Sequence, residues 1–180
     1  MITIDDVVKA SGLNIKRIFN VYVFGSRVYG TNNTNSDWDV IVVANNSVES
    51  IELVQDNLNI HIYTPDKFKN DLNLYDIKNI ECLYLPKWAV LMNEIDYGID
   101  KIDKVKLRHS ISHKSNNLWV KCKKKLAQDD YYIGIKSLFH SFRIPIFAIE
   151  LLDKNEINFN SGNYIWDKLN SKQWTWEEIK

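Results

Sequence analysis

Hydrophobic residues in the first part of the chain come in short runs separated by polar turns. Runs of this length predict β-strands, and the last of them alternates apolar and polar residues; the predicted strands cover 19–24, 37–44 and 58–63. Cap-like Thr, Asp and Gly residues predict short helices at 3–12 and 65–74, and residues 26–31 and 76–82 are also expected to be helical. The pattern therefore predicts a small α/β unit of three or four strands.

The pattern changes after residue 75. The segment Tyr84–Met92 reads as a short strand or an extended stretch interrupted by Pro86, and longer helical periods follow it. These periods predict helices over 101–127, over 130–152 with a kink at Pro145, and a short one within 160–180. We therefore expect an α+β protein, with a small mixed-sheet core at 1–75 and a mainly helical domain at 76–180.

Basic and acidic side chains are unevenly distributed, although each kind numbers 23 and the formal net charge is zero. Residues 1–100 carry 8 basic and 14 acidic side chains, whereas residues 101–125 carry 9 basic side chains against Asp103 alone. The overall balance excludes a uniformly basic surface that coats nucleic acid. The asymmetry is consistent with an acidic half that takes a cation and a basic half that takes phosphate.

Cysteine usage and the apolar runs bear on the compartment. Cys82 and Cys122 have no CxxC spacing, which is typical of neither a disulfide framework nor a zinc site. The first residues do not resemble a signal peptide, and no apolar run reaches the length of a membrane span. We expect a cytoplasmic protein, and the abundance of Asn and Ile is typical of AT-rich viral or microbial coding sequences.

Two polar clusters flank the loop at 31–36. Gly25 follows the first strand and permits a close approach of ligand to backbone. Ser26 opens a helical turn, so its hydroxyl and backbone N–H groups are available to a phosphate. Asp37 and Asp39 begin the second strand two residues apart, so we expect both carboxylates on one face. Paired carboxylates are hard oxygen ligands suited to Mg²⁺.

The spacing of these clusters resembles the signature of the nucleotidyltransferase superfamily, which has the DNA polymerase beta-like fold. The resemblance covers about residues 18–70 and is greatest to minimal members; it rests on Phe24-Gly25-Ser26, a spacer of ten residues, and Asp37-Trp38-Asp39-Val40. It implies transfer of a nucleoside monophosphate from a nucleoside triphosphate, such as ATP, to a hydroxyl on RNA, protein or a small molecule, with release of pyrophosphate. It further implies that Asp37 and Asp39 are catalytic and hold Mg²⁺ or Mn²⁺. The nucleotide contacts that it implies are Gly25, Ser26, Arg27 and Ser36.

The third strand departs from the family pattern. The resemblance implies a third carboxylate there that deprotonates the attacking hydroxyl, but its position holds Asn59, and an amide cannot act as a base. His61 shares a face with Asn59 and could serve as the general base near neutral pH. A carboxylate from elsewhere could also reach the site, or the chain could bind nucleotide without transferring it; the carboxylate candidates are Asp56, Asp66 and Glu81.

The cationic residues of the second half fall on helix faces. On the helix over 110–126 a lysine stripe lies beside an apolar stripe, and on the next helix basic residues follow at i, i+4 and i+7. Such stripes can be solvated faces or can pair with the acids of the first half. Alternatively, they bind a triphosphate or a polynucleotide backbone. The candidate nucleotide-binding residues here are Lys121, Lys125, Lys136, His140 and Arg143.

Three functions remain open from the sequence. The first is the metal-dependent nucleotidyltransferase described above. The second, motivated by Asn59, is a non-catalytic nucleotide- or nucleic-acid-binding module on the same fold. The third is an antitoxin-like protein that transfers AMP to a toxin, since small members of the superfamily resemble such antitoxins.

Overall fold

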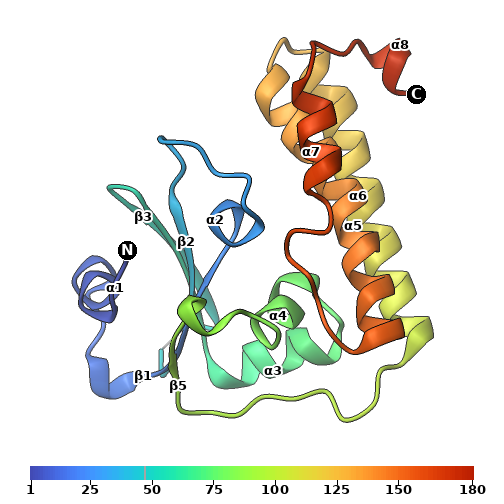
Figure 1. Ribbon diagram of the computed structural model, residues 1–180. Coiled ribbons are helices and arrows are strands. Elements are labelled where there is room, and N and C mark those ends of the chain that lie inside the picture. Colours follow the sequence, from blue (N-terminus) through green and yellow to red (C-terminus); the bar gives the residue numbers. More distant parts are fainter. Residues whose placement is uncertain (47) are drawn as a thin grey trace. The chain divides into compact units, whose positions relative to one another are not determined.

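The computed structural model describes residues 1–46 and 48–180, which form two compact units, Met1–Lys101 and Ile102–Lys180. All strands of the described residues lie in the first unit, and the second consists of helices and their connections (Figure 1). This organisation confirms the predicted α+β class. None of the described helices is long and apolar enough to cross a membrane.

A five-stranded mixed sheet forms the first unit, with the strand order β3-β4-β2-β1-β5. β2 and β4 run parallel, whereas the other neighbouring strands are antiparallel. The strands are β1 (Ile18–Phe24), β2 (Trp38–Ala44), β3 (Ser50–Gln55), β4 (Leu58–Tyr63) and β5 (Val90–Asn93).

The register of β1, β2 and β4 places the residues around Asp39 side by side. Phe24 on β1 lies opposite Asp39 on β2, and Asp39 lies opposite Asn59 on β4. Paired residues of neighbouring strands point to the same face, so these three side chains form one row, which we call the polar row. The next row points to the other face and is fully apolar and buried; it consists of Val23, Val40 and Ile60.

Local sequence explains where the helices of the first unit begin and end. Thr3 and Asp6 form a capping box at the start of α1, and Gly12 ends this helix with a φ of 66°. Thr64 caps α3, which begins with proline. The helices, with the two short 3₁₀ turns, are α1 (Ile4–Ser11), η1 (Ile15–Arg17), α2 (Ser26–Tyr29), α3 (Pro65–Asn73), α4 (Ile77–Cys82) and η2 (Lys87–Ala89).

Helices cover both faces of the sheet. Phe68 of α3 packs against the rings of Tyr22 and Tyr63, with centroids 6.0 and 6.2 Å apart, and both tyrosines share the face of Asp39 by strand alternation. α3 and α4 therefore cover the face that carries the polar row, and α1 lies on the other side (Figure 1).

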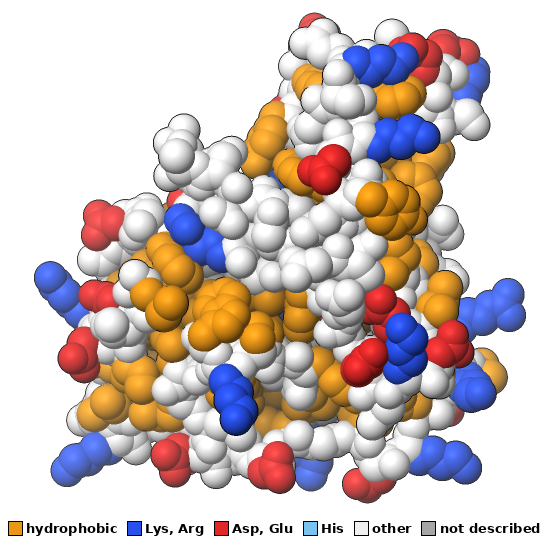
Figure 2. All heavy atoms as spheres, in the orientation of Figure 1, with side chains coloured by type: hydrophobic (Ala, Val, Ile, Leu, Met, Phe, Trp, Pro, Cys, Tyr) orange, Lys and Arg blue, Asp and Glu red, His pale blue; other side chains and the backbone are white. Residues whose placement is uncertain are grey.

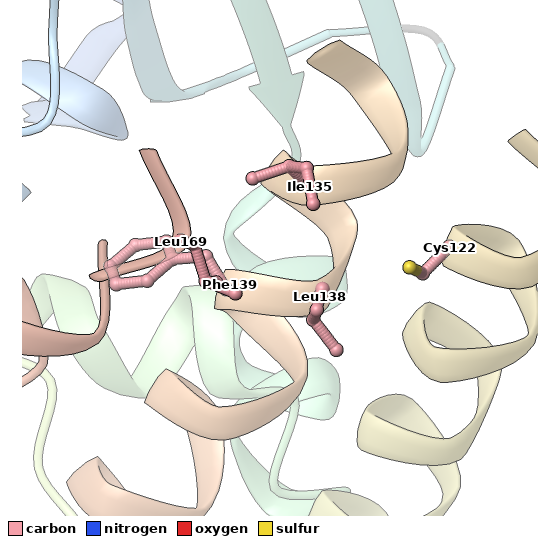
Figure 3. Packing of buried hydrophobic residues seen from close by; sticks show 5 residues of the cluster. All are labelled: Cys122, Ile135, Leu138, Phe139 and Leu169. Carbon is pink, nitrogen blue, oxygen red and sulfur yellow. The ribbon is translucent and has the colours of Figure 1, made fainter. Parts of the chain in front are cut away.

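The second unit contains two long helices and two short ones, α5 (Lys104–Leu126), α6 (Tyr131–Lys154), α7 (Asn163–Asn170) and α8 (Trp176–Ile179). Its core cluster draws side chains from α5, α6 and α7 (Figure 3): Cys122, Ile135, Leu138, Phe139 and Leu169. Trp119, Trp166, Trp174 and Trp176 pack around this cluster. On the face shown in Figure 2, basic, acidic and hydrophobic side chains are interspersed over the end of the unit where α8 lies.

Pro145 lies inside α6, which nevertheless continues from Tyr131 to Lys154. Proline has no N–H, so it cannot donate to the carbonyl of Ser141, four residues earlier. The hydroxyl of Ser115 on α5 donates to this carbonyl at 2.6 Å. A side chain of the neighbouring helix thus provides the hydrogen bond that proline removes.

Three features differ from the sequence-based expectation. β3 was not predicted, because it is an edge strand with mostly exposed side chains that pairs only with β4. The expected boundary after residue 75 falls inside the first unit, since α4 and β5 pack with β1. The single short helix expected within 160–180 is two helices, α7 and α8.

Candidate functional site

Gly25 directly follows β1, and its backbone lies against the carboxylate of Asp39. Its φ and ψ are 80° and −158°, in a region that favours glycine. A Cβ atom at this position would lie 2.1 Å from Oδ2 of Asp39, closer than any non-bonded contact allows. Glycine is therefore required both by the turn and by the position of the acid.

A single turn of helix, α2, follows Gly25 and is held by contacts with the rest of the unit. Ser26 is 9% exposed, and its carbonyl accepts from the N–H of Thr31 at 3.0 Å. The hydroxyl of Tyr29 donates to Oε2 of Glu81 at 2.6 Å within the protein interior. Glu81, considered above as a replacement third acid, is thus engaged in supporting α2.

Asp37 and Asp39 occupy the end of the sheet beside this turn. Asp37 is exposed and precedes the first residue of β2, whereas Asp39 is half-buried within β2 between Phe24 and Asn59. The structure therefore places Gly25 beside the polar row, which includes Asp39. Asp37 lies two residues before Asp39 in the chain.

Arg27 is bound to the loop that carries Asp37. Its Nη2 donates to the carbonyl of Ser36 at 2.5 Å and its Nε to the carbonyl of Asp37 at 3.3 Å, while the guanidinium lies 4.2 Å from the ring centre of Trp38. The Ser36 hydroxyl accepts from the N–H of Asn33 at 2.9 Å. These contacts favour a role for Arg27 and Ser36 in shaping the loop rather than in binding phosphate directly.

Asn59 lies within hydrogen-bonding distance of Asp39. Its Nδ2 donates to Oδ1 of Asp39 at 3.2 Å, while its own buried Oδ1 has no hydrogen-bond partner among the described residues. Rotating the amide by half a turn would bring Oδ1 beside the carboxylate. Two oxygens about 3 Å apart fit adjacent positions around one Mg²⁺. The donors Asp39 and Asn59 therefore fit a divalent cation, and the exposed Asp37, two residues before Asp39 in the chain, is the further carboxylate proposed from the sequence.

Other acids do not add to this set. Asp56 is exposed in the turn between β3 and β4, and Asp66 is exposed in the first turn of α3. Across residues 1–46 and 48–180, no three His, Cys, Asp or Glu side chains are grouped as a metal site. The candidate cation site thus consists of two carboxylates and one amide.

His61 lies two residues along β4 from Asn59 on the same face. Its ring centroid is 5.6 Å from that of Phe24, and its Nε2 is 3.9 Å from Oε1 of Glu52. Burial lowers the pKa of His61 and the charge of Lys78 lowers it further, whereas Glu52 raises it. The imidazole is therefore held neutral, the form that can accept a proton.

Lys78 on α4 lies near the polar row and was missing from the sequence-based site. Its Nζ is 5.2 Å from the ring centre of Tyr63 and 6.0 Å from that of Phe24. A signal was available, since the predicted helix at 76–82 follows closely on the strand that carries Asn59. The direction of its side chain, however, depends on how the helix packs.

The predicted basic residues of the second unit have varied surroundings. Lys121 is exposed, Lys136 is half-buried, and Lys125 pairs with Asp130 at 2.9 Å. Nε of the buried Arg143 donates to Nδ1 of His140 at 3.1 Å. Burial lowers the pKa of His140 well below its usual value, and Arg143 contributes to the shift. His140 is therefore neutral and does not add positive charge to the helix face.

Comparison with known proteins identifies one matching family. The model of the family described as "Nucleotidyltransferase domain" matches residues 6–101, more than half of the chain. Among solved structures, the chain is similar to a nucleotidyltransferase-like protein from Exiguobacterium sibiricum 255-15, with 11% identity and a TM-score of 0.38. The match covers 87% of this chain, which spans 58% of the length of that structure. No curated protein gives a significant match.

Proposed function

This chain belongs to the nucleotidyltransferase domain family, and on that premise we propose that it transfers a nucleoside monophosphate from a nucleoside triphosphate to a hydroxyl group. The hydroxyl oxygen forms a bond to the α-phosphorus, the bond from that phosphorus to the bridging oxygen breaks, and pyrophosphate leaves. The observation that carries the proposal is the contact between Gly25 and Asp39, because it joins the two halves of the motif in one structure.

Asp37, Asp39 and Asn59 would hold the divalent cation, Mg²⁺ or Mn²⁺. A bound cation would neutralise charge on the triphosphate oxygens and orient the α-phosphate. The absence of a side chain at Gly25 leaves room for the Asp39 carboxylate beside the backbone, and the Ser26 hydroxyl would be a donor for a phosphate. Arg27 keeps Asp37 in position through the loop carbonyls.

His61 would accept the proton of the attacking hydroxyl. Its neutral imidazole lies on the same sheet face as Asp39 and Asn59, and neutral histidine is a competent base at pH 7. Asn59 cannot replace the missing carboxylate in this step, because an amide does not bind a proton in this pH range.

The basic residues Lys121, Lys125 and Lys136 are proposed to contact the triphosphate or a polynucleotide acceptor. Their helices α5 and α6 carry the charge that such a contact needs. His140 and Arg143 of α6 are proposed to support this basic face rather than to contact phosphate, because they hydrogen-bond to one another.

A second candidate is a module that binds nucleotide without transferring it. The observation that favours it is the hydrogen bond from Asn59 to Asp39, which occupies the acid with a neutral partner. In this case cation and nucleotide bind, but the hydroxyl is not activated.

One experiment separates the two candidates. The protein is incubated with α-labelled nucleoside triphosphates, Mg²⁺ or Mn²⁺, and mixed RNA or cell lysate, and the label on acceptors is measured. Transfer lost in Asp39→Ala and retained in Glu94→Gln, which removes an exposed acid after β5, supports the transferase. Nucleotide binding without transfer to any acceptor contradicts it, and a gain of transfer in Asn59→Asp would identify the missing acid as the limitation.

A further inference from the structure

Lys78 places a positive charge over the sheet face that carries the candidate site. Phe24 lies opposite Asp39, and Tyr63 follows Asn59 and His61 on the same face of β4. Nζ of Lys78 lies 5.2 Å from the ring centre of Tyr63 and 6.0 Å from that of Phe24. The ammonium group is thus held near the polar row by residues that are part of the same face.

The hydrogen-bond donors of this ammonium group are unused. Nζ of Lys78 carries three N–H donors, and within residues 1–46 and 48–180 it forms no hydrogen bond or ion pair. Lys67 on the neighbouring helix α3, in contrast, pairs with Asp71. Ring faces attract a cation but do not accept its N–H groups as an anion does. A half-buried cation with free donors is suited to an anionic ligand.

We propose that Lys78 binds the β- and γ-phosphates of the nucleotide held at Asp37 and Asp39. Phosphate oxygens accept the free N–H groups of Nζ, while the rings of Phe24 and Tyr63 keep the lysine side chain in place. The positive charge then neutralises the pyrophosphate as it leaves. This assignment rests on the proposed function, because it requires a triphosphate at the site.

The test measures binding of inorganic triphosphate and of a non-hydrolysable nucleotide to the full chain, by calorimetry in the presence of Mg²⁺. Lys78→Met is compared with Lys69→Met, which removes the same charge from an exposed position on α3. Loss of a charge-assisted contact predicts at least about tenfold weaker binding in Lys78→Met. Lys69→Met should bind as the wild type does, and Lys78→Arg should retain most of the affinity.

A measurement on the wild type keeps the test independent of variant folding. The ¹⁵N resonance of the Lys78 side chain should shift on addition of triphosphate, whereas that of Lys69 should not. Equal affinities of Lys78→Met and Lys69→Met, or a Lys78 resonance that does not respond to triphosphate, would overturn the assignment.

Failure of the Lys78 assignment can be distinguished from failure of the proposed transferase function. Binding of triphosphate through Lys78 without label transfer to any acceptor supports the lysine assignment and contradicts the transferase. Label transfer with full triphosphate affinity in Lys78→Met supports the transferase and contradicts the lysine assignment.

Discussion

Gly25 shows how one residue determines the geometry of the site. Its φ of 80° favours glycine, and a Cβ atom here would lie only 2.1 Å from Oδ2 of Asp39, which leaves no room for any side chain. The chain can therefore bring the end of β1 against the acid only with glycine at this position.

Replacing Gly25 by alanine should lower the rate of transfer strongly and the free energy of unfolding only modestly. The added methyl group must displace the Asp39 carboxylate, and a displacement of about 1 Å at a reacting group costs on the order of 100-fold in rate. The strained φ adds about 1–3 kcal/mol of destabilisation. Transfer rates and urea unfolding measure both effects. Gly98→Ala is the matched control, because nothing lies within 4 Å of its added Cβ; equal rates in the two variants would contradict this view of Gly25.

His61 should titrate below its usual pKa of 6.5, because burial and Lys78 both disfavour the charged form. The folded state then binds the proton less readily than the unfolded chain. The stabilisation from neutral His61 is complete above pH 6.5 and is lost as the pH falls through the folded-state pKa. In NMR titrations, Lys78→Met should raise the pKa of His61 and Glu52→Gln should lower it. A pKa that responds to neither change would refute this electrostatic account.

Local sequence reveals only those site residues that lie close together along the chain. The interval from Gly25 to Asp39 is one turn and one loop, so its residues are recognisable by spacing. Arg27 belongs to the same interval, but its contacts with loop carbonyls depend on the path of the loop. Lys78 and the pairing of Tyr29 with Glu81 depend on tertiary packing, which spacing does not encode.

At the level of elements, α6 shows how a helix accommodates an internal proline. The sequence predicted a kink at Pro145, and the helix continues through this residue. The compensating hydrogen bond comes from Ser115, 26 residues before Ser141. Periodicity within one helix cannot predict a donor on another helix.

Removing the Ser115 hydroxyl should destabilise the second unit. Ser115→Ala leaves the carbonyl of the buried Ser141 without this donor, which costs about 1–3 kcal/mol. The cost should shrink in a Pro145→Ala background, because alanine restores a backbone N–H. Urea unfolding of the single and double variants measures the coupling. Ser112→Ala, at an exposed position of α5, is the control, and equal costs in both backgrounds would rule out the compensation.

Strands were predictable to the extent that they are buried. β1, β2 and β4 lie in the centre of the sheet and have strongly apolar sequences. β3 is an edge strand whose side chains are mostly exposed, so its sequence lacks the apolar pattern of a buried strand.

For the whole molecule, the zero net charge conceals an acidic first half and a basic segment at 101–125. The structure assigns the acidic part to the sheet unit and most of the basic segment to α5. The first unit thus offers acids for a cation, and the second offers lysines for a phosphate.

Lys121→Gln should weaken nucleotide binding modestly if the lysine face of α5 contacts the triphosphate. A single exposed charge contributes up to about 1 kcal/mol, which corresponds to a KM increase of about two- to fivefold that diminishes at high salt. Steady-state kinetics at two ionic strengths measure it. Lys168→Gln on α7 removes an equally exposed charge and serves as the control. The same KM in both variants would exclude Lys121 from the site.

If Asp39 supports nucleotidyl transfer, acceptor labelling and pyrophosphate release must both depend on it, and the two are measured together. With an α-labelled nucleoside triphosphate and Mg²⁺ or Mn²⁺, the wild type should release one pyrophosphate for each label transferred. Asp39→Asn should reduce both signals together by at least about 100-fold while the protein stays folded. Transfer that persists undiminished in Asp39→Asn, or label transferred without release of pyrophosphate, would contradict this role of Asp39.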